Sequence, residues 1–95
     1  MSVAYSDSAL ADLAAILAYV DARSPAGRRS VMRSIRDAVE LIGEYPRRGR
    51  FVDEPNVRVV QAGRYPYLIY WTTEGDAATI VHIRHAARKS PSISP

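Results

Sequence analysis

Residues 44–56 separate two halves of the chain with different hydrophobic patterns, and this break constrains the fold more than any other feature of the sequence. The segment contains Pro46, Gly49 and Pro55 and cannot continue a helix. Before it, apolar residues recur at helical spacing. After it, they fall into short runs rich in β-branched and aromatic residues. The order of helices followed by strands predicts a domain of the α+β class.

Two helices are expected in the first half. Ser6 is placed as the N-cap of the first helix, directly after a short edge strand at residues 2–5. Ser24 is placed as the N-cap of the second helix, where Pro25 occupies the first turn and its missing N–H does no harm. Because the connection between the helices is so short, they should form an antiparallel hairpin.

The first helix has a wide apolar arc. Its central stripe consists of Leu10, Leu13, Ala14 and Leu17, with Ala9, Ile16 and Val20 beside it. Such an arc fits a helix that contacts both its own core and a second chain, and it equally fits a helix sunk deep in a small domain.

The second helix has an apolar stripe of ordinary width and an opposite face that is charged. On this face Arg33 and Asp37 are spaced for an i,i+4 ion pair, as are Arg36 and Glu40. The charged face is expected to be simply solvated.

Three strands are expected in the second half, at residues 57–61, 65–72 and 77–84. Short turns join them, so they should form an antiparallel meander. The faces of residues 67–71 stay open, because apolar residues occupy both parities and a one-residue slip would exchange them.

The last strand has a clearer alternation. A period of two places Val81 and Ile83 on one face and His82 and Arg84 on the other. Together these elements predict a short N-terminal edge strand, an antiparallel helical hairpin and a three-stranded antiparallel sheet with one face covered by the helices.

The length of 95 residues predicts one domain, at residues 1–89, with a flexible tail rich in Ser and Pro at residues 90–95. No apolar segment reaches the length that a bilayer requires, and the N-terminus does not have the pattern of a secretory signal. A cytoplasmic location is therefore expected.

The charge is unevenly distributed. Residues 1–44 contain five arginines against six acidic residues, whereas residues 45–95 contain eight cationic residues against four acidic ones. Twelve of the thirteen cationic residues are arginine, whose planar guanidinium binds phosphate and carboxylate through two-point contacts. A polyanion or an acidic protein is therefore a natural partner. The segment at residues 44–56 carries three of these arginines and is either functional or a plain crossover.

The second half is expected to form a cationic concavity on the open face of the sheet or at its rim. The residues expected there are Arg58, Arg64, His82, Arg84, His85, Arg88 and Lys89. Phosphate groups would be attracted to this surface, and their binding would weaken with salt.

Several kinds of chemistry are not supported by the sequence. The chain has no cysteine, which excludes disulfides, thiolate metal sites and cysteine nucleophiles. His82 and His85 would point to opposite faces and have no carboxylate at ligand spacing, so neither a metal nor a cofactor is expected. These histidines are the only groups whose ordinary pKa lies near neutrality, although a histidine at a strand end is more often structural.

A set of short motifs resembles one known family in order and spacing across residues 3–89. The motifs are Leu10-Ala11-Asp12-Leu13 with Tyr19, Ser24-Pro25, Tyr45-Pro46 with Gly49-Arg50, Val57-Arg58, Gly63-Arg64-Tyr65-Pro66-Tyr67, Tyr70, and the segment from Ile80 to Arg88. Together they resemble the RelE/ParE superfamily, the toxins of type II toxin–antitoxin modules, and most of all its ParE branch. The fold of that superfamily is the α+β arrangement described above.

The resemblance implies a ParE-like toxin that inhibits DNA gyrase by binding, without catalysing a reaction, and that a cognate antitoxin neutralises. The residues expected to bind the target are Arg58, Arg64, Arg84, His85 and Arg88. The residues expected to bind the antitoxin are Ile16, Tyr19, Val20 and Leu41, on the helical hairpin.

Two other interpretations remain open. The first is a RelE-like, ribosome-dependent mRNA endonuclease, in which His85 or His82 would transfer protons while Arg58, Arg64, Arg84 and Arg88 held the phosphate. RelE-like nucleases usually have a tyrosine near the carboxyl terminus, and this chain has none after Tyr70. The second is a plain interaction module that has kept only antitoxin binding.

Overall fold

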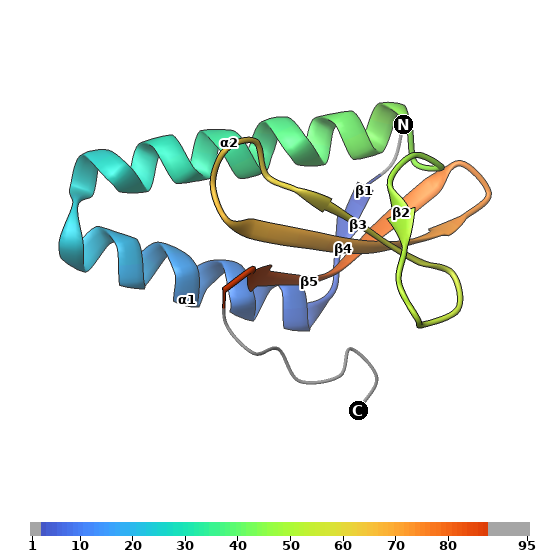
Figure 1. Ribbon diagram of the computed structural model, residues 1–95, viewed down its shortest axis with the longest axis horizontal. Coiled ribbons are helices and arrows are strands. Elements are labelled where there is room, and N and C mark those ends of the chain that lie inside the picture. Colours follow the sequence, from blue (N-terminus) through green and yellow to red (C-terminus); the bar gives the residue numbers. More distant parts are fainter. Residues whose placement is uncertain (1–2, 88–95) are drawn as a thin grey trace.

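The computed structural model of the chain describes residues 3–87 (Figure 1). Arg88, Lys89 and the tail expected at residues 90–95 lie outside the described residues. The elements, in chain order, are β1 (Val3–Tyr5), α1 (Asp7–Arg23), α2 (Pro25–Glu44), β2 (Arg50–Phe51), β3 (Val57–Gln61), β4 (Tyr67–Glu74) and β5 (Ala77–His85). No helix in residues 3–87 is long and apolar enough to cross a membrane.

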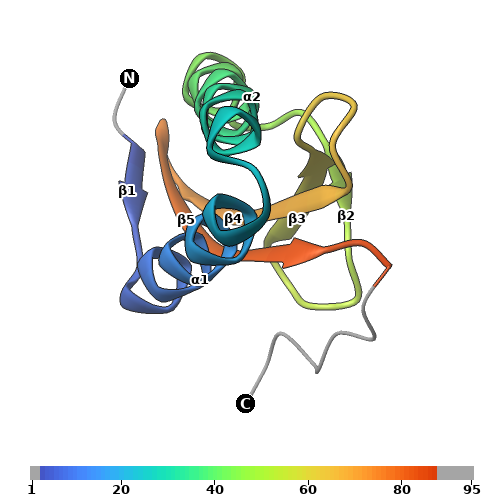
Figure 2. The ribbon, with the colours of Figure 1, turned by 90° about the vertical axis from the view of Figure 1, so that its left-hand side faces the viewer.

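The strands form one mixed sheet in the order β1-β5-β4-β3-β2, with β1 parallel to β5 and the other neighbours antiparallel. The α1–α2 hairpin packs on the sheet, and Figure 2 shows it end on, with its turn toward the viewer. This arrangement confirms the α+β class, the antiparallel hairpin and the meander. It adds one strand to the prediction, because residues 50–51 of the expected loop pair with β3.

Both predicted N-caps are present. The Oγ of Ser6 accepts a hydrogen bond from the N–H of Ala9 at 3.0 Å, and the Oγ of Ser24 accepts one from the N–H of Gly27 at 3.0 Å. Each cap satisfies one of the N–H groups that the first turn of a helix leaves without a partner.

The core-facing side of α1 differs from the predicted stripe. Ala9 and Ile16 are buried in the core, with Leu13 and Val20 packed against it, whereas Leu10 is 50% exposed. The helix is thus rotated by about one residue from the expected orientation. This rotation allows Ser6 and Asp12 to form hydrogen bonds with the backbone of β5.

The structure decides the faces of β4, which the sequence left open. Tyr67, Ile69 and Trp71 point into the core beneath the helices. The register of β4 with β5 shifts by one residue between Tyr70 and Trp71, and this β-bulge changes which residues of β5 face the core.

Because of the β-bulge, the side chains of β5 do not alternate between the two faces as predicted. Ile80 and Ile83 are both buried, although a strict period of two would place them on opposite faces, and Val81 lies between them at the bulge. Val81, which the predicted alternation grouped with Ile83, is only partly buried and lies outside the core cluster, so the strict alternation does not hold at the bulge. His82 and Arg84 do share the other face, since they lie opposite Tyr70 and Leu68.

The loop after α2 closes one end of the core. The indole N–H of Trp71 donates a hydrogen bond to the carbonyl of Pro46 at 2.9 Å, and Nη1 of Arg58 donates one to the carbonyl of Arg47 at 2.7 Å. Gly49 has a φ of +90°, and a Cβ at this position would lie 2.5 Å from Cη2 of Trp71. The backbone of the loop is therefore tied to the sheet, and it can approach the indole only because residue 49 has no side chain.

We predict that Gly49→Ala lowers the free energy of unfolding by about 2–5 kcal/mol. Two costs contribute. An alanine in the left-handed backbone conformation of residue 49 costs about 1–2 kcal/mol, and overpacking of its Cβ against Trp71 costs about 1–3 kcal/mol. Gly75→Ala is the control, because Gly75 has a φ of +62° with nothing within 4 Å of a Cβ. It should lose only about 1–2 kcal/mol. Urea unfolding measures both values, and equal losses would show that contact with the indole does not matter.

Candidate functional site

The first two turns of α1 lie against the edge of β5. Strand β1 ends opposite Ile80 and leaves the rest of this edge without a neighbouring strand. The N–H of Ser6 donates to the carbonyl of Ile80 at 2.9 Å, and its hydroxyl donates to the carbonyl of Val81 at 3.1 Å. Farther along, Oδ2 of Asp12 accepts a hydrogen bond from the N–H of Ile83 at 3.0 Å. The helix thus satisfies the backbone groups that β1 does not reach.

Asp12 also connects two of the residues that the sequence singled out. Its Oδ2 lies 3.2 Å from Nδ1 of His82, and its Oδ1 lies 3.8 Å from Nη1 of Arg84. These are the ion pairs found within residues 3–87, and all three side chains are largely buried. The predicted pairs within α2, Arg33 with Asp37 and Arg36 with Glu40, do not form there.

The ring nitrogen of His82 has two competing neighbours. Nη2 of Arg84 lies 3.2 Å from Nδ1 of His82, the same distance as the carboxylate of Asp12. One ring nitrogen can donate to the carboxylate when protonated or accept from the guanidinium when unprotonated, but it cannot do both. Asp12, His82 and Arg84 therefore form one coupled network, which joins α1 to the open face of the sheet.

His85 and Arg64 lie at the same end of the sheet. His85 is paired with Tyr67, and its ring meets that of Tyr67 edge on, with 5.4 Å between the ring centroids. Nδ1 of His85 accepts a hydrogen bond from the N–H of Ala87 at 3.1 Å. Arg64 lies in the turn between β3 and β4. Hydrogen bonds from Arg64 and Ser30 lower the pKa of Tyr65 below its ordinary value.

The predicted target-binding residues are only partly brought together. Arg64, Arg84 and His85 gather at the end of the sheet where β3 turns into β4 and β5 ends. Arg58 does not join them. It lies opposite Trp71 and therefore on the helix-facing side of the sheet, where its guanidinium stacks on Phe51 at 4.0 Å.

Arg58 thus holds the loop after α2 in place, and the expectation that it belongs to a single cationic concavity was wrong. Its position follows from register, since residues directly opposite in an antiparallel pair share a face. Arg88 lies outside the described residues.

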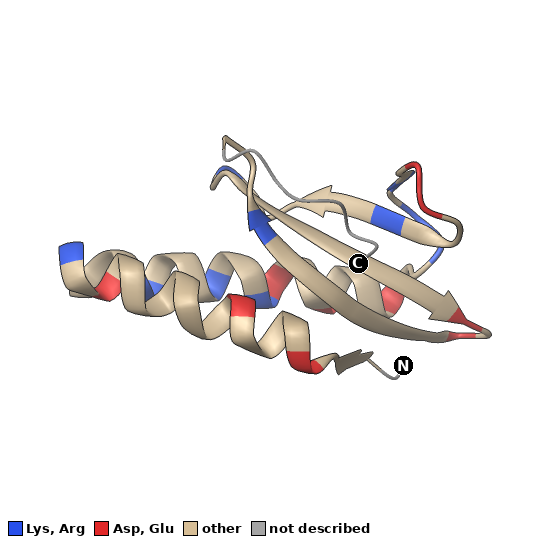
Figure 3. Cartoon of the chain, turned by 90° about the horizontal axis from the view of Figure 1, so that it is seen from below, with Lys and Arg blue, Asp and Glu red and all other residues tan. Residues whose placement is uncertain are grey.

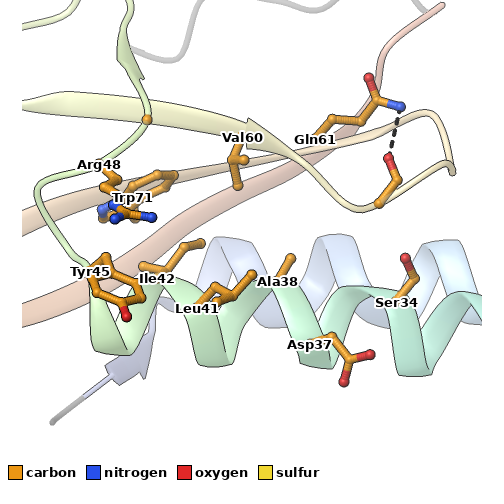
Figure 4. A pocket seen from close by; sticks show the side chains of 12 residues that line it. Ser34, Asp37, Ala38, Leu41, Ile42, Tyr45, Arg48, Val60, Gln61 and Trp71 are labelled. Carbon is orange, nitrogen blue, oxygen red and sulfur yellow. Dashed lines mark hydrogen bonds between the residues drawn. The ribbon is translucent and has the colours of Figure 1, made fainter.

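A groove lies between α2 and β3, and it was not predicted from the sequence. It has a volume of about 420 Å³, and its walls include the exposed side chains of Leu41, Tyr45 and Val60 (Figure 4). Trp71 and Tyr45 lie toward one end and Ser34 and Gln61 toward the other, and Gly49 and Gly63 also line the groove. One signal was available, because Tyr45 follows Leu41 by four residues and so lies on the same side of the helix end.

The predicted antitoxin residues are dispersed. Leu41 is 57% exposed on the wall of the groove. Tyr19 is exposed near the end of α1, and Val20 beside it packs partly against the core. Ile16 is 9% exposed and belongs to the core, so its expected position outside the core stripe was wrong. The rotation of α1 is the cause.

The charged positions are unevenly distributed. Figure 3 shows several Arg positions along the helices toward their joined end, with an acidic position among them, and another Arg position at the β3–β4 turn, whereas the tip of the β4–β5 hairpin is acidic. Within residues 3–87 no group of three or more His, Asp or Glu side chains could hold a metal ion.

Comparisons with known proteins agree on the family. A family model described as "ParE toxin of type II toxin-antitoxin system, parDE" matches residues 3–90. Toxin RelE2 of Caulobacter vibrioides is 35% identical over 86 residues, which cover 90% of this chain and 96% of that protein. A solved structure of the chromosomal ParDE TA system from P. aeruginosa matches with a TM-score of 0.80 at 24% identity, covering 90% of this chain and 95% of that chain.

The fold and the length of the match define a toxin of the RelE/ParE superfamily. Within it, the chain belongs to the ParE toxin family of type II toxin–antitoxin systems, because the family model covers nearly the whole sequence.

We predict that Asp12→Ala lowers the free energy of unfolding by about 1–3 kcal/mol, because the N–H of Ile83 loses its acceptor and His82 and Arg84 lose their carboxylate. Asp12→Asn keeps an acceptor and should lose less. Asp21→Ala is the control, since Asp21 is exposed on the same helix and should change stability by less than about 0.5 kcal/mol. Urea unfolding would contradict the assignment if the variants at positions 12 and 21 behaved alike.

Proposed function

We propose that this toxin inhibits DNA gyrase in the cytoplasm by binding, without catalysing a reaction, and that a cognate antitoxin neutralises it. The chain belongs to the ParE family, which supports a target of this kind. The observation that carries the proposal is the state of the proton-transfer groups beside Arg84, because each of them already has an intramolecular partner.

His85 is poorly arranged to act as a base. Its Nδ1 accepts the N–H of Ala87, so a neutral His85 carries its proton on Nε2 and has no free lone pair to offer a substrate hydroxyl. Arg84 lies beside the carboxylate of Asp12. This negative charge offsets part of the positive charge with which Arg84 would otherwise stabilise a scissile phosphate. A surface with these properties is better suited to recognition than to cleavage.

The surface proposed for the target consists of Arg64, Arg84 and His85 at the end of the sheet. The guanidinium groups offer directional donors for carboxylate or phosphate, and a neutral His85 offers an N–H donor. Arg88, three residues beyond His85 in the sequence, stays part of the proposal on sequence grounds alone.

The groove between α2 and β3 is the surface proposed for the antitoxin. Its walls include three apolar or aromatic side chains that are exposed in the free chain, and an amphipathic helix or an extended segment could bury them. Gly63, next to Arg64 in the sequence, is one of the residues that line the groove. A segment bound there would lie beside the proposed target surface, and this position suggests how binding could neutralise the toxin. Tyr19 and Val20, on α1, would form a separate contact.

One observation favours the RelE-like nuclease as a second candidate. The carboxylate of Asp12 lies 3.2 Å from Nδ1 of His82, and a carboxylate in this position can orient an imidazole so that Nε2 acts as a base. The relative from Caulobacter vibrioides is named Toxin RelE2, which is compatible with this alternative. On this interpretation His82, rather than His85, would take the proton.

We expect the purified toxin to stop supercoiling by gyrase, or to trap cleaved DNA, in an assay that contains no ribosomes. Arg84→Glu should abolish this effect, whereas His82→Ala should keep most of it, provided that both variants remain folded by circular dichroism. Cleavage of ribosome-bound mRNA that disappears in His82→Ala would instead establish the nuclease. If neither activity is found and expression leaves growth unharmed, the chain is an interaction module only.

We expect Leu41→Glu to weaken antitoxin binding by at least about tenfold, because a charge would replace an apolar contact in the groove. Leu10→Glu is the matched control, since Leu10 is similarly exposed but lies on α1 outside the groove. Isothermal titration with the antitoxin encoded beside the toxin gene measures both. Equal weakening by the two variants, or by Leu10→Glu alone, would move the antitoxin surface to α1.

A further inference from the structure

Two stretches of the chain that contain no acidic residue meet at the surface. Residues 22–36 contain five arginines and no Asp or Glu, and residues 61–73 contain Arg64 and no Asp or Glu. The second stretch turns back on the first, because the Oγ of Ser34 donates to the carbonyl of Ala62 at 2.9 Å.

This contact brings arginines from two elements to one surface. Arg33 precedes Ser34 by one residue in α2 and is therefore level, along the helix axis, with the β3–β4 turn that carries Arg64. Arg29 precedes Arg33 by four residues, on the same side of the helix and about 6 Å away along its axis. We name the surface formed by Arg29, Arg33 and Arg64 the arginine ridge.

The guanidinium groups of the ridge are not neutralised within the molecule. All three arginines are exposed, and within residues 3–87 none of them forms an ion pair, because both ion pairs there involve Asp12. Asp37 follows Arg33 by one helical turn, but no ion pair joins them.

The loop after α2, at residues 44–56, is also rich in arginine but differs from the ridge in each of these respects. Arg47 donates to the carbonyl of Gly75, and Arg58 packs on Phe51, so both are used to hold the loop. Arg48 and Arg50 share their loop with Glu44, Asp53 and Glu54. The loop is therefore basic in sequence but close to neutral as a surface, and it serves as an internal reference for the ridge.

We propose that the arginine ridge binds the phosphate backbone of duplex DNA. Guanidinium groups spaced by one helical turn can contact successive phosphates, and the charge on DNA makes such binding favourable without base contacts. A duplex fits better than a single strand, because Tyr65, the aromatic side chain next to Arg64, is already covered by that guanidinium at 5.5 Å, and single-strand sites rely on free aromatic rings for stacking.

The inference goes beyond the proposed inhibition of gyrase and is tested without that enzyme. The ridge lies on α2 and the β3–β4 turn, and of the residues assigned to the protein target it shares only Arg64. If the chain did not bind DNA, the proposal of gyrase inhibition would be unaffected. If Arg84→Glu lost gyrase inhibition, the proposal of DNA binding by the ridge would be unaffected.

The experiment measures the anisotropy of a labelled DNA duplex of about two helical turns, titrated with the full chain at several salt concentrations between about 50 and 200 mM. The test variant is Arg33→Gln with Arg64→Gln. The matched control is Arg48→Gln with Arg50→Gln, which removes the same charge from the loop. Urea unfolding of both variants checks that each remains folded.

We expect the slope of log K against log salt to fall by about 2 in the test variant and by less than about 0.5 in the control. Affinity at about 100 mM salt should fall at least about tenfold in the test variant only. No binding by the wild-type chain at about 50 mM salt, or equal losses in the two variants, would overturn the proposal. Tighter binding of a single strand of the same length would overturn the assignment to a duplex.

Discussion

The contact of α1 with the free edge of β5 determines much of the rest of the structure. An exposed strand edge presents backbone donors and acceptors that need partners, and β1 covers only the part of this edge that ends at Ile80. Ser6 and Asp12 satisfy the next groups along β5. Since both belong to the start of α1, their bonds stabilise its observed rotation. That rotation buries Ile16, exposes Leu10 and puts the carboxylate of Asp12 beside His82 and Arg84.

The arginines of this protein perform different tasks, which their neighbours determine. Arg58 and Arg47 stabilise a loop through backbone carbonyls and an aromatic ring. Arg84 takes part in a network with a carboxylate and an imidazole. Within residues 3–87 Arg33 and Arg64 have no acidic partner, and the β3–β4 turn that carries Arg64 packs against α2 at Ser34. A count of cationic residues gives the net charge, but it does not show which arginines are free to bind a partner.

The proposed surfaces are neighbours rather than separate regions. The α2–β3 groove is lined by Ser34 and Gly63, and these residues adjoin Arg33 and Arg64. A segment that fills the groove would therefore approach both the end of the sheet and the arginine ridge. This proximity suggests one physical route to neutralisation, in which an acidic or apolar segment covers the groove and screens nearby guanidinium groups at the same time.

The sequence alone determined the class of fold, both helix caps, the hairpin and the strands that form the meander, because caps, proline positions and hydrophobic period act over a few residues. It also identified Arg64, Arg84 and His85 as neighbours, since they lie close to the same strand ends. Only the tertiary structure decided the rotation of α1, the bulge at Val81, the side on which Arg58 lies and the groove beside Leu41. These features depend on strand register and on how one element packs on another, and the free energies that decide them come from contacts between residues far apart in the chain.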